Sequence, residues 1–90
     1  MKSIIQKEWD RCYICHGLPT DVHHLFGGSR RKKADKDGLT IHVCRGCHQK
    51  IHEGEQSGLY QLLLHQKGQM TFENEHSREY FMERYGKNYL

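Results

Sequence analysis

Four cysteines in two pairs constrain this chain more than any other feature. Cys12 and Cys15 form one C-x-x-C pair, and Cys44 and Cys47 form a second. Two such pairs can supply the four thiolates of one tetrahedral zinc ion. A chain of 90 residues with a mean hydropathy of −0.90 buries a small core, and a bound metal is a common supplement at this size. We therefore expect a structural zinc site at these cysteines.

Two disulfides are the alternative use of four cysteines. The sequence shows no hydrophobic segment of the kind that directs secretion, which favours the cytoplasm, where thiols stay reduced. The spacing of the pairs and the histidines beside them also favour zinc over disulfides. No stretch approaches the roughly 18 apolar residues of a membrane helix. We therefore expect a cytoplasmic protein with no membrane partner.

Four histidines within or beside the cysteine pairs predict a second metal site. His48 and His52 are four residues apart, which on a helix places both side chains on one face. His23 and His24 lie in the spacer of 28 residues between the pairs. Neighbours on a strand point to opposite faces, so one could bind a metal while the other faces a substrate. The alternative is one buried and one exposed histidine, neither with a role in chemistry.

A run of cations follows the histidine pair. Such a run suits the phosphate backbone of a nucleic acid, although a solvated loop is the alternative. The net charge of the chain is a mild +3, so the local run carries this prediction rather than the overall charge. The candidate DNA-binding residues are Arg30, Arg31, Lys32 and Lys33.

The hydrophobic patterns predict a small α+β domain. We expect residues 2–11 to form a short helix that packs Ile4, Ile5 and Trp9 on the core. The other expected elements are strands over residues 20–26 and 39–43 with a basic loop between them, a helix from Cys47 or His48 to about Gly54, a helix over residues 57–67 that stops at Gly68, and a helix between an N-cap at Ser77 and a C-cap at Gly86.

The order of these motifs resembles that of the HNH endonucleases, whose fold is the ββα-metal, or His-Me, finger. The resemblance is carried by Asp-Val-His-His-Leu-Phe-Gly-Gly at residues 21–28 and Val-Cys-Arg-Gly-Cys-His-Gln-Lys-Ile-His at residues 43–52. It implies one domain over residues 1–90, with the HNH core at 12–54. The C-terminal helical extension at 55–90 is similar to the tail of small phage and prophage HNH proteins.

The resemblance implies a role for each matching residue. His23 would bind a catalytic ion together with His48 and His52, and His24 would be the general base that activates water. The ion could be Mg²⁺, Mn²⁺, Ni²⁺ or Zn²⁺. The family's Asn, which orients the base, has no counterpart at residues 35–40. Asp37 is the candidate in its place, with a backbone carbonyl or His42 as alternatives.

The expected function is metal-dependent hydrolysis of DNA phosphodiester bonds, by nicking with low sequence specificity. The resemblance suggests a phage-encoded or bacterial protein and leaves a second copy of the chain or another phage protein open as a partner. A non-catalytic zinc-containing module that binds nucleic acid is the alternative, and an adaptor that uses zinc only to fold is a third possibility. His16, His65 and His76 fall outside the pattern and receive no role.

Overall fold

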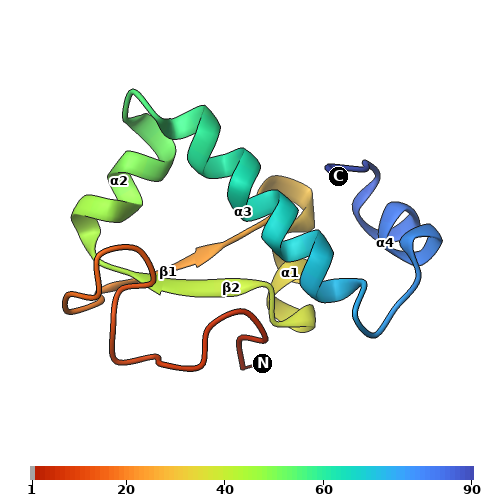
Figure 1. Cartoon of the computed structure of the whole chain (residues 1–90), viewed down its shortest axis with the longest axis horizontal. Coiled ribbons are helices and arrows are strands. Elements are labelled where there is room, and N and C mark those ends of the chain that lie inside the picture. The colour runs from red at the N-terminus through yellow and green to blue at the C-terminus, as the bar shows by residue number, and fades with distance from the viewer. Residues whose placement is uncertain (1) are drawn as a thin grey trace.

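Two short antiparallel strands lie at the centre of the molecule (Figure 1). The computed structural model describes residues 2–90. β1 (Asp21–His24) pairs with β2 (Thr40–Val43), with His23 opposite Ile41 and His24 opposite Thr40. Both strands were predicted from the sequence. β1 is shorter than predicted because the chain turns inward after His24 and buries the next two side chains in the core.

Helices surround this hairpin and complete a small α+β fold. Figure 1 shows α2 and α3 joined at an angle above the hairpin, α1 in the connection between the strands, and α4 near the C-terminus. None of the helices over residues 2–90 combines the length and the apolar character that crossing a membrane requires. The elements are η1 (Gly28–Arg30), α1 (Arg31–Asp37), α2 (Arg45–Glu53), α3 (Ser57–Phe72) and α4 (Arg78–Tyr85).

The N-terminal segment is not the predicted helix. Residues 2–11 form bends and turns beside β2. The side chain of Gln6 is buried, and its Oε1 accepts a hydrogen bond from the backbone N–H of His42 at 2.7 Å. Such side-chain bonds to backbone groups compete with helix formation. Ile4 and Trp9 remain 45% and 40% exposed, so the expected packing of these two side chains on the core is wrong.

The basic segment between the strands is the helix α1, where a loop was predicted. Ala34 is its buried side chain, so its sequence has little of the apolar periodicity that predicts a helix. Gly38 ends α1 in the left-handed conformation, with a φ of 74°. A Cβ atom at this position would lie 2.5 Å from the carbonyl oxygen of Lys2. A glycine is therefore needed where α1 turns into β2.

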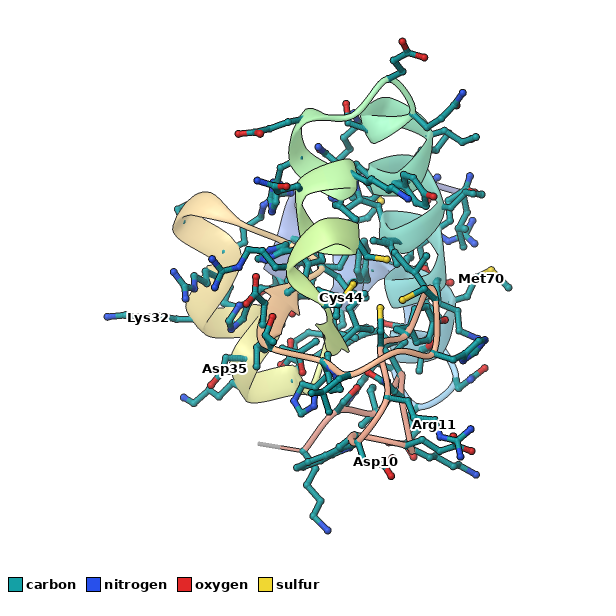
Figure 2. All side chains as sticks on the ribbon, turned by 90° about the vertical axis from the view of Figure 1, so that its left-hand side faces the viewer. Asp10, Arg11, Lys32, Asp35, Cys44 and Met70 are labelled. Carbon is teal, nitrogen blue, oxygen red and sulfur yellow. The ribbon has the colours of Figure 1, made fainter. Side chains whose placement is uncertain are left out.

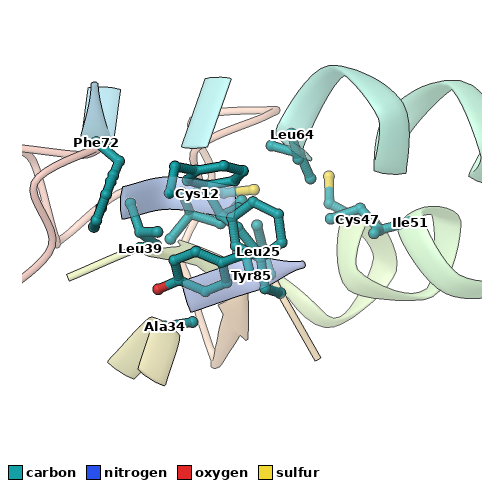
Figure 3. Packing of buried hydrophobic residues seen from close by; sticks show 13 residues of the cluster. Cys12, Leu25, Ala34, Leu39, Cys47, Ile51, Leu64, Phe72 and Tyr85 are labelled. Carbon is teal, nitrogen blue, oxygen red and sulfur yellow. The ribbon is translucent and has the colours of Figure 1, made fainter. Parts of the chain in front are cut away.

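The core lies between the hairpin, α3 and α4, as Figure 3 shows for its apolar side chains. α3 continues to Phe72, past the predicted stop at Gly68. A Cβ atom on Gly68 would lie 3.0 Å from the ring of Phe26 and 3.1 Å from Leu25. Glycine at this position therefore lets α3 approach the chain that follows β1. The opposite side of α3 is half-exposed and carries Leu59, Leu62 and Leu63.

α4 begins and ends as predicted. The hydroxyl of Ser77 accepts a hydrogen bond from the backbone N–H of Tyr80 at the N-cap, and Gly86 ends the helix in the left-handed conformation. The serine hydroxyl satisfies a free N–H of the first turn, and the backbone N–H of left-handed Gly86 bonds the carbonyl oxygen of Met82 in the last turn, so these two residues define the length of the helix.

Candidate metal centres and active site

The four cysteines meet in one cluster, and their spacing fits a structural zinc ion. Their sulfur atoms all lie within 4.8 Å of one another, and Cys15 Sγ and Cys44 Sγ are 3.7 Å apart. Four sulfur ligands at about 2.3 Å from a tetrahedral zinc would be about 3.8 Å apart. Figure 2 shows sulfur atoms gathered around the labelled Cys44, and Figure 3 shows Cys12 and Cys47 among the packed side chains of the core.

Backbone groups surround these sulfur atoms. The N–H of Cys15 donates to Cys12 Sγ at 3.5 Å, and the N–H of Cys47 donates to Cys44 Sγ at 3.4 Å. Burial acts to raise the pKa of Cys12, but hydrogen bonds with backbone groups, that of Cys15 foremost, outweigh it and lower this pKa to about 6. Burial raises the pKa of Cys47 to about 12. A bound metal cation would therefore be needed to hold all four as thiolates.

The second cysteine pair also starts the helix that carries two of the histidines. Cys44 is the N-cap of α2, and its Sγ accepts from the N–H of Cys47. The helix begins at Arg45, earlier than predicted. His48 and His52 then lie one turn apart, with their Nε2 atoms 3.2 Å from each other. Nitrogen ligands about 2.0 Å from a tetrahedral metal would be separated by about 3.3 Å, so this pair is spaced for a shared ion.

His23 completes a cluster of three imidazoles between β1 and α2. The centroid of its ring lies 5.3 Å from that of His48 and 5.1 Å from that of His52, and one nitrogen of each ring falls within 4.8 Å of the others. Burial, followed by the charges of the neighbouring histidines, lowers the pKa of His23 to about 4. The buried imidazole is therefore neutral at pH 7, the form that binds a metal. The predicted ligand set comes together in space.

Asp21 supports this cluster, although no role was predicted for it from the sequence. Its Oδ2 lies 2.8 Å from Nδ1 of His48 and accepts from Nε of Arg45 at 3.1 Å. A carboxylate at Nδ1 holds the proton there, so Nε2 of His48 keeps its lone pair for a metal. The hydrogen bond to His48 lowers the pKa of Asp21. Strand alternation could have indicated this residue, because Asp21 and His23 share one face of β1.

His24 lies next to the cluster and has a carboxylate of its own. It ends β1, and its Nε2 is 3.2 Å from Oδ1 of Asp35 on α1. Asp37, which was predicted to support His24, instead accepts hydrogen bonds from Arg84 and Tyr85. Residues two apart on a helix point about 200° away from each other, so one of these two aspartates faces His24 and the other faces α4.

His42, an alternative candidate to support His24, has a different partner. Nδ1 of His42 lies 3.0 Å from the carbonyl oxygen of Trp9 in the N-terminal segment. This imidazole therefore takes part in holding that segment to β2. The carboxylate of Asp35 is the group that the structure places against His24.

Three hollows in the surface meet at His24. The central one, of about 280 Å³, is lined by all four histidines of the two motifs and by Arg31. A second, of about 850 Å³, follows α1 and is lined by His24, Asp35 and a group of cations. A third, of about 330 Å³, extends from the histidines toward α3. The site is therefore open to solvent on both sides of His24.

The four cations predicted to contact DNA divide into two groups. Arg30 is used within the protein, where its Nη1 donates to the carbonyl oxygen of Tyr85 at 3.0 Å and to the hydroxyl of Tyr89 at 2.9 Å. Lys33 donates to the carbonyl oxygen of Arg84 but remains exposed. Figure 2 shows Lys32 pointing away from the body of the molecule. The exposed cations that line the hollow along α1 are Arg31, Lys32, Lys33 and Lys36.

Comparisons of the chain with protein-family models, with curated proteins and with solved structures find no significant match in any of the three. The function of this chain must therefore be inferred from its two metal-binding clusters and from the hollows around His24.

Proposed function

We propose that this chain is a metal-dependent DNA endonuclease of the HNH type, built on a ββα-metal finger. One observation carries the proposal. Three imidazoles cluster as possible metal ligands, and a fourth, that of His24, lies beside them with its own carboxylate partner, Asp35. An imidazole bound to a metal cannot also accept a proton from water. Metal-assisted hydrolysis with a histidine base therefore needs both groups side by side.

His24 is the general base in this proposal, and Asp35 is its positioning residue. Because Nε2 of His24 faces a carboxylate oxygen at 3.2 Å, we expect this nitrogen to carry the proton. Nδ1 is then the atom that accepts a proton from the attacking water. A carboxylate in this position fixes both the tautomer and the orientation of an imidazole. General-base catalysis of this kind contributes about 10²–10⁴-fold to the rate.

His23, His48 and His52 would hold the catalytic divalent ion. Once bound, this ion would act as a Lewis acid toward the charge that develops on the phosphate and on the leaving oxygen. The three imidazoles leave coordination positions for water and substrate, whereas the cysteine cluster supplies a full set of four ligands and suits a structural zinc.

The hollow along α1 supports DNA as the substrate. Its exposed cations adjoin His24 directly, so a phosphate backbone lying on them would pass the base. Contacts to the backbone position a nucleic acid but carry little sequence information. We therefore expect nicking with low sequence specificity.

The proposal is tested with a supercoiled plasmid, using zinc-loaded protein with Mg²⁺, Mn²⁺, Ni²⁺ or EDTA. Wild type should nick the plasmid in the presence of at least one ion, and His24→Ala should be slower by about 10²–10⁴-fold while it retains its fold and its zinc. His76→Ala is the matched control, because this exposed histidine lies before α4. It should cut like wild type.

A folded, zinc-loaded wild type that cuts with none of these ions would overturn the nuclease. DNA affinity then becomes the test of the alternative, a non-catalytic zinc module that binds nucleic acid through the cations of α1. Cleavage by His24→Ala at the wild-type rate would instead overturn the role of His24.

A further inference from the structure

The hollow between the histidines and α3 is not used by the hydrolysis proposed for this site. It has a volume of about 330 Å³ and shares its inner end, formed by His23, His24 and His52, with the candidate active site. Its outer wall comes from α3 and consists of Gln61, Leu64 and His65. A substrate bound at His24 would therefore lie directly beside this wall.

The α3 wall is held in place by contacts within the protein. Nε2 of Gln61 donates to the carbonyl oxygen of Ile51 at 3.0 Å. The ring of His65 stacks on that of Phe26, with centroids 5.0 Å apart and planes inclined by 10°, and also contacts Tyr89. Leu64 is 6% exposed and belongs to the core. The wall is therefore preformed and does not need a ligand to order it.

The close approach of α3 depends on a glycine rather than on the site itself. Gly68 lies against Phe26, where any side chain would meet that ring. This contact holds α3 near the end of β1, and His65 lies about one helical turn before Gly68. The packing of the core thus creates the hollow next to the histidines.

The two hollows that flank His24 differ in charge. The α1 side presents several exposed cations, which suit phosphates. On the α3 side the cation is Arg30, whose Nη1 is already bonded to Tyr85 and Tyr89. The imidazole of His65, the small exposed part of Leu64 and the free amide oxygen of Gln61 offer a surface that is apolar with a few polar groups, which suits a sugar and a base.

We propose that the α3 hollow binds the nucleoside attached to the scissile phosphate. The substrate strand would then run from the cations of α1, across His24, to α3. The volume is at the lower end of the range of about 300–1,000 Å³ typical of small-molecule sites, which suits one nucleoside rather than a run of bases. This inference rests on the proposed function, because it places the phosphate at His24.

The test uses binding and does not depend on cleavage. Thymidine 5′-monophosphate, thymidine 3′-monophosphate and inorganic phosphate are titrated into zinc-loaded, full-length protein with Mg²⁺, while the imidazole signals of His65 are followed by NMR. At least one nucleotide should shift these signals and bind roughly tenfold more tightly than inorganic phosphate.

Gln61→Trp should fill the hollow and remove the preference for nucleotide over phosphate. Leu62→Trp is the matched control, because Leu62 is the next residue of α3 and is 45% exposed. It should keep the preference. Nucleotides that bind no better than phosphate, or that bind Gln61→Trp as they bind wild type, would overturn the inference. If Gln61→Trp fails to fold, the His65 signals of wild type decide the question.

The two proposals can fail separately. Plasmid nicking without any nucleotide preference would overturn the α3 hollow and leave the nuclease standing. Nucleotide binding at His65 in a chain that does not cut DNA would overturn the nuclease and leave a nucleotide-binding hollow.

Discussion

The cysteine cluster and the histidine cluster share the helix α2 but differ in their surroundings. Cys12 and Cys47 are 0% and 5% exposed, whereas Cys15 is exposed, and backbone N–H groups donate to the sulfur atoms of Cys12 and Cys44. The histidine cluster likewise joins a buried residue, His23, to an exposed one, His52, but a carboxylate oxygen of Asp21 lies 2.8 Å from His48 Nδ1. One helix thus takes part in a closed site, whose four sulfur atoms would fill a tetrahedral metal, and in an open site, whose three imidazoles would leave a position free.

Cys12→Ser should have the largest effect, because it removes a fully buried ligand from the closed site. Structural zinc can supply on the order of 10 kcal/mol of apparent binding energy, which is comparable to the whole stability of a typical domain, about 5–15 kcal/mol. We expect loss of zinc and of cooperative thermal unfolding. Circular dichroism and the zinc content per chain measure both.

His52→Ala is the counterpart in the open site and should leave the fold and the zinc of the cysteine cluster intact. The contrast between the two clusters breaks down if His52→Ala unfolds the chain, or if Cys12→Ser keeps its zinc and its melting temperature.

Asp21→Asn should weaken the open site without affecting the closed one. Loss of a carboxylate behind a metal-binding histidine typically costs about 10–100-fold in metal affinity or activity. Calorimetric titration of Ni²⁺ or Mn²⁺ into zinc-loaded protein measures the affinity. Asp10→Asn, an exposed carboxylate in the N-terminal segment, is the control and should bind like wild type. Equal affinities would show that Asp21 does not orient His48.

Asp35→Asn and Asp37→Asn should separate catalysis from stability. Asp35 contacts His24, so we expect its loss to slow cleavage by roughly tenfold at unchanged melting temperature. Asp37 accepts from Arg84 and from the hydroxyl of Tyr85, both partly or fully buried. Losing the charge that pairs with Arg84 should lower the free energy of unfolding by about 3 kcal/mol and leave the cleavage rate of the folded protein unchanged. The opposite result for the pair would restore Asp37 as the support of His24.

Lys32→Ala combined with Lys36→Ala should have the smallest effect, a change in the salt dependence of DNA binding. Each lost phosphate contact reduces the slope of log affinity against log salt concentration by about 0.9, so the double variant should lose up to about 1.8. Lys67→Ala on α3 is the control. An unchanged slope in the double variant would argue against α1 as the DNA-binding surface.

The sequence predicted which possible metal ligands cluster better than it predicted the local structure of the chain. The two cysteine pairs, the three clustered histidines and the caps of α4 each depend on residue types at fixed spacing, and all of them come together as expected. The predicted roles of the histidines in catalysis stay predictions. Spacing is informative here because two ligands separated by one helical turn or by a tight turn have few ways to be placed.

The errors arose where contacts between distant segments decide the conformation. Gln6 bonds to the backbone beside β2 and holds the N-terminal segment out of a helix. Gly68 lies inside α3, where the ring of Phe26 packs so closely that a Cβ atom would crowd it. Asp35 was missed as the partner of His24 because finding it requires recognising α1 as a helix, and the single buried alanine of α1 gives no periodic signal. Such contacts depend on how distant segments pack, which local sequence patterns do not encode.

The position of Cys44 has a consequence for the order in which the molecule assembles. This residue belongs to the cysteine cluster and is also the N-cap of the helix that carries His48 and His52. An ion captured by the thiols would fix the start of that helix, and with it the separation of the two imidazoles by one turn. Metal loading should therefore follow a sequence in time, with the thiolate-bound ion first and the imidazole-bound ion second.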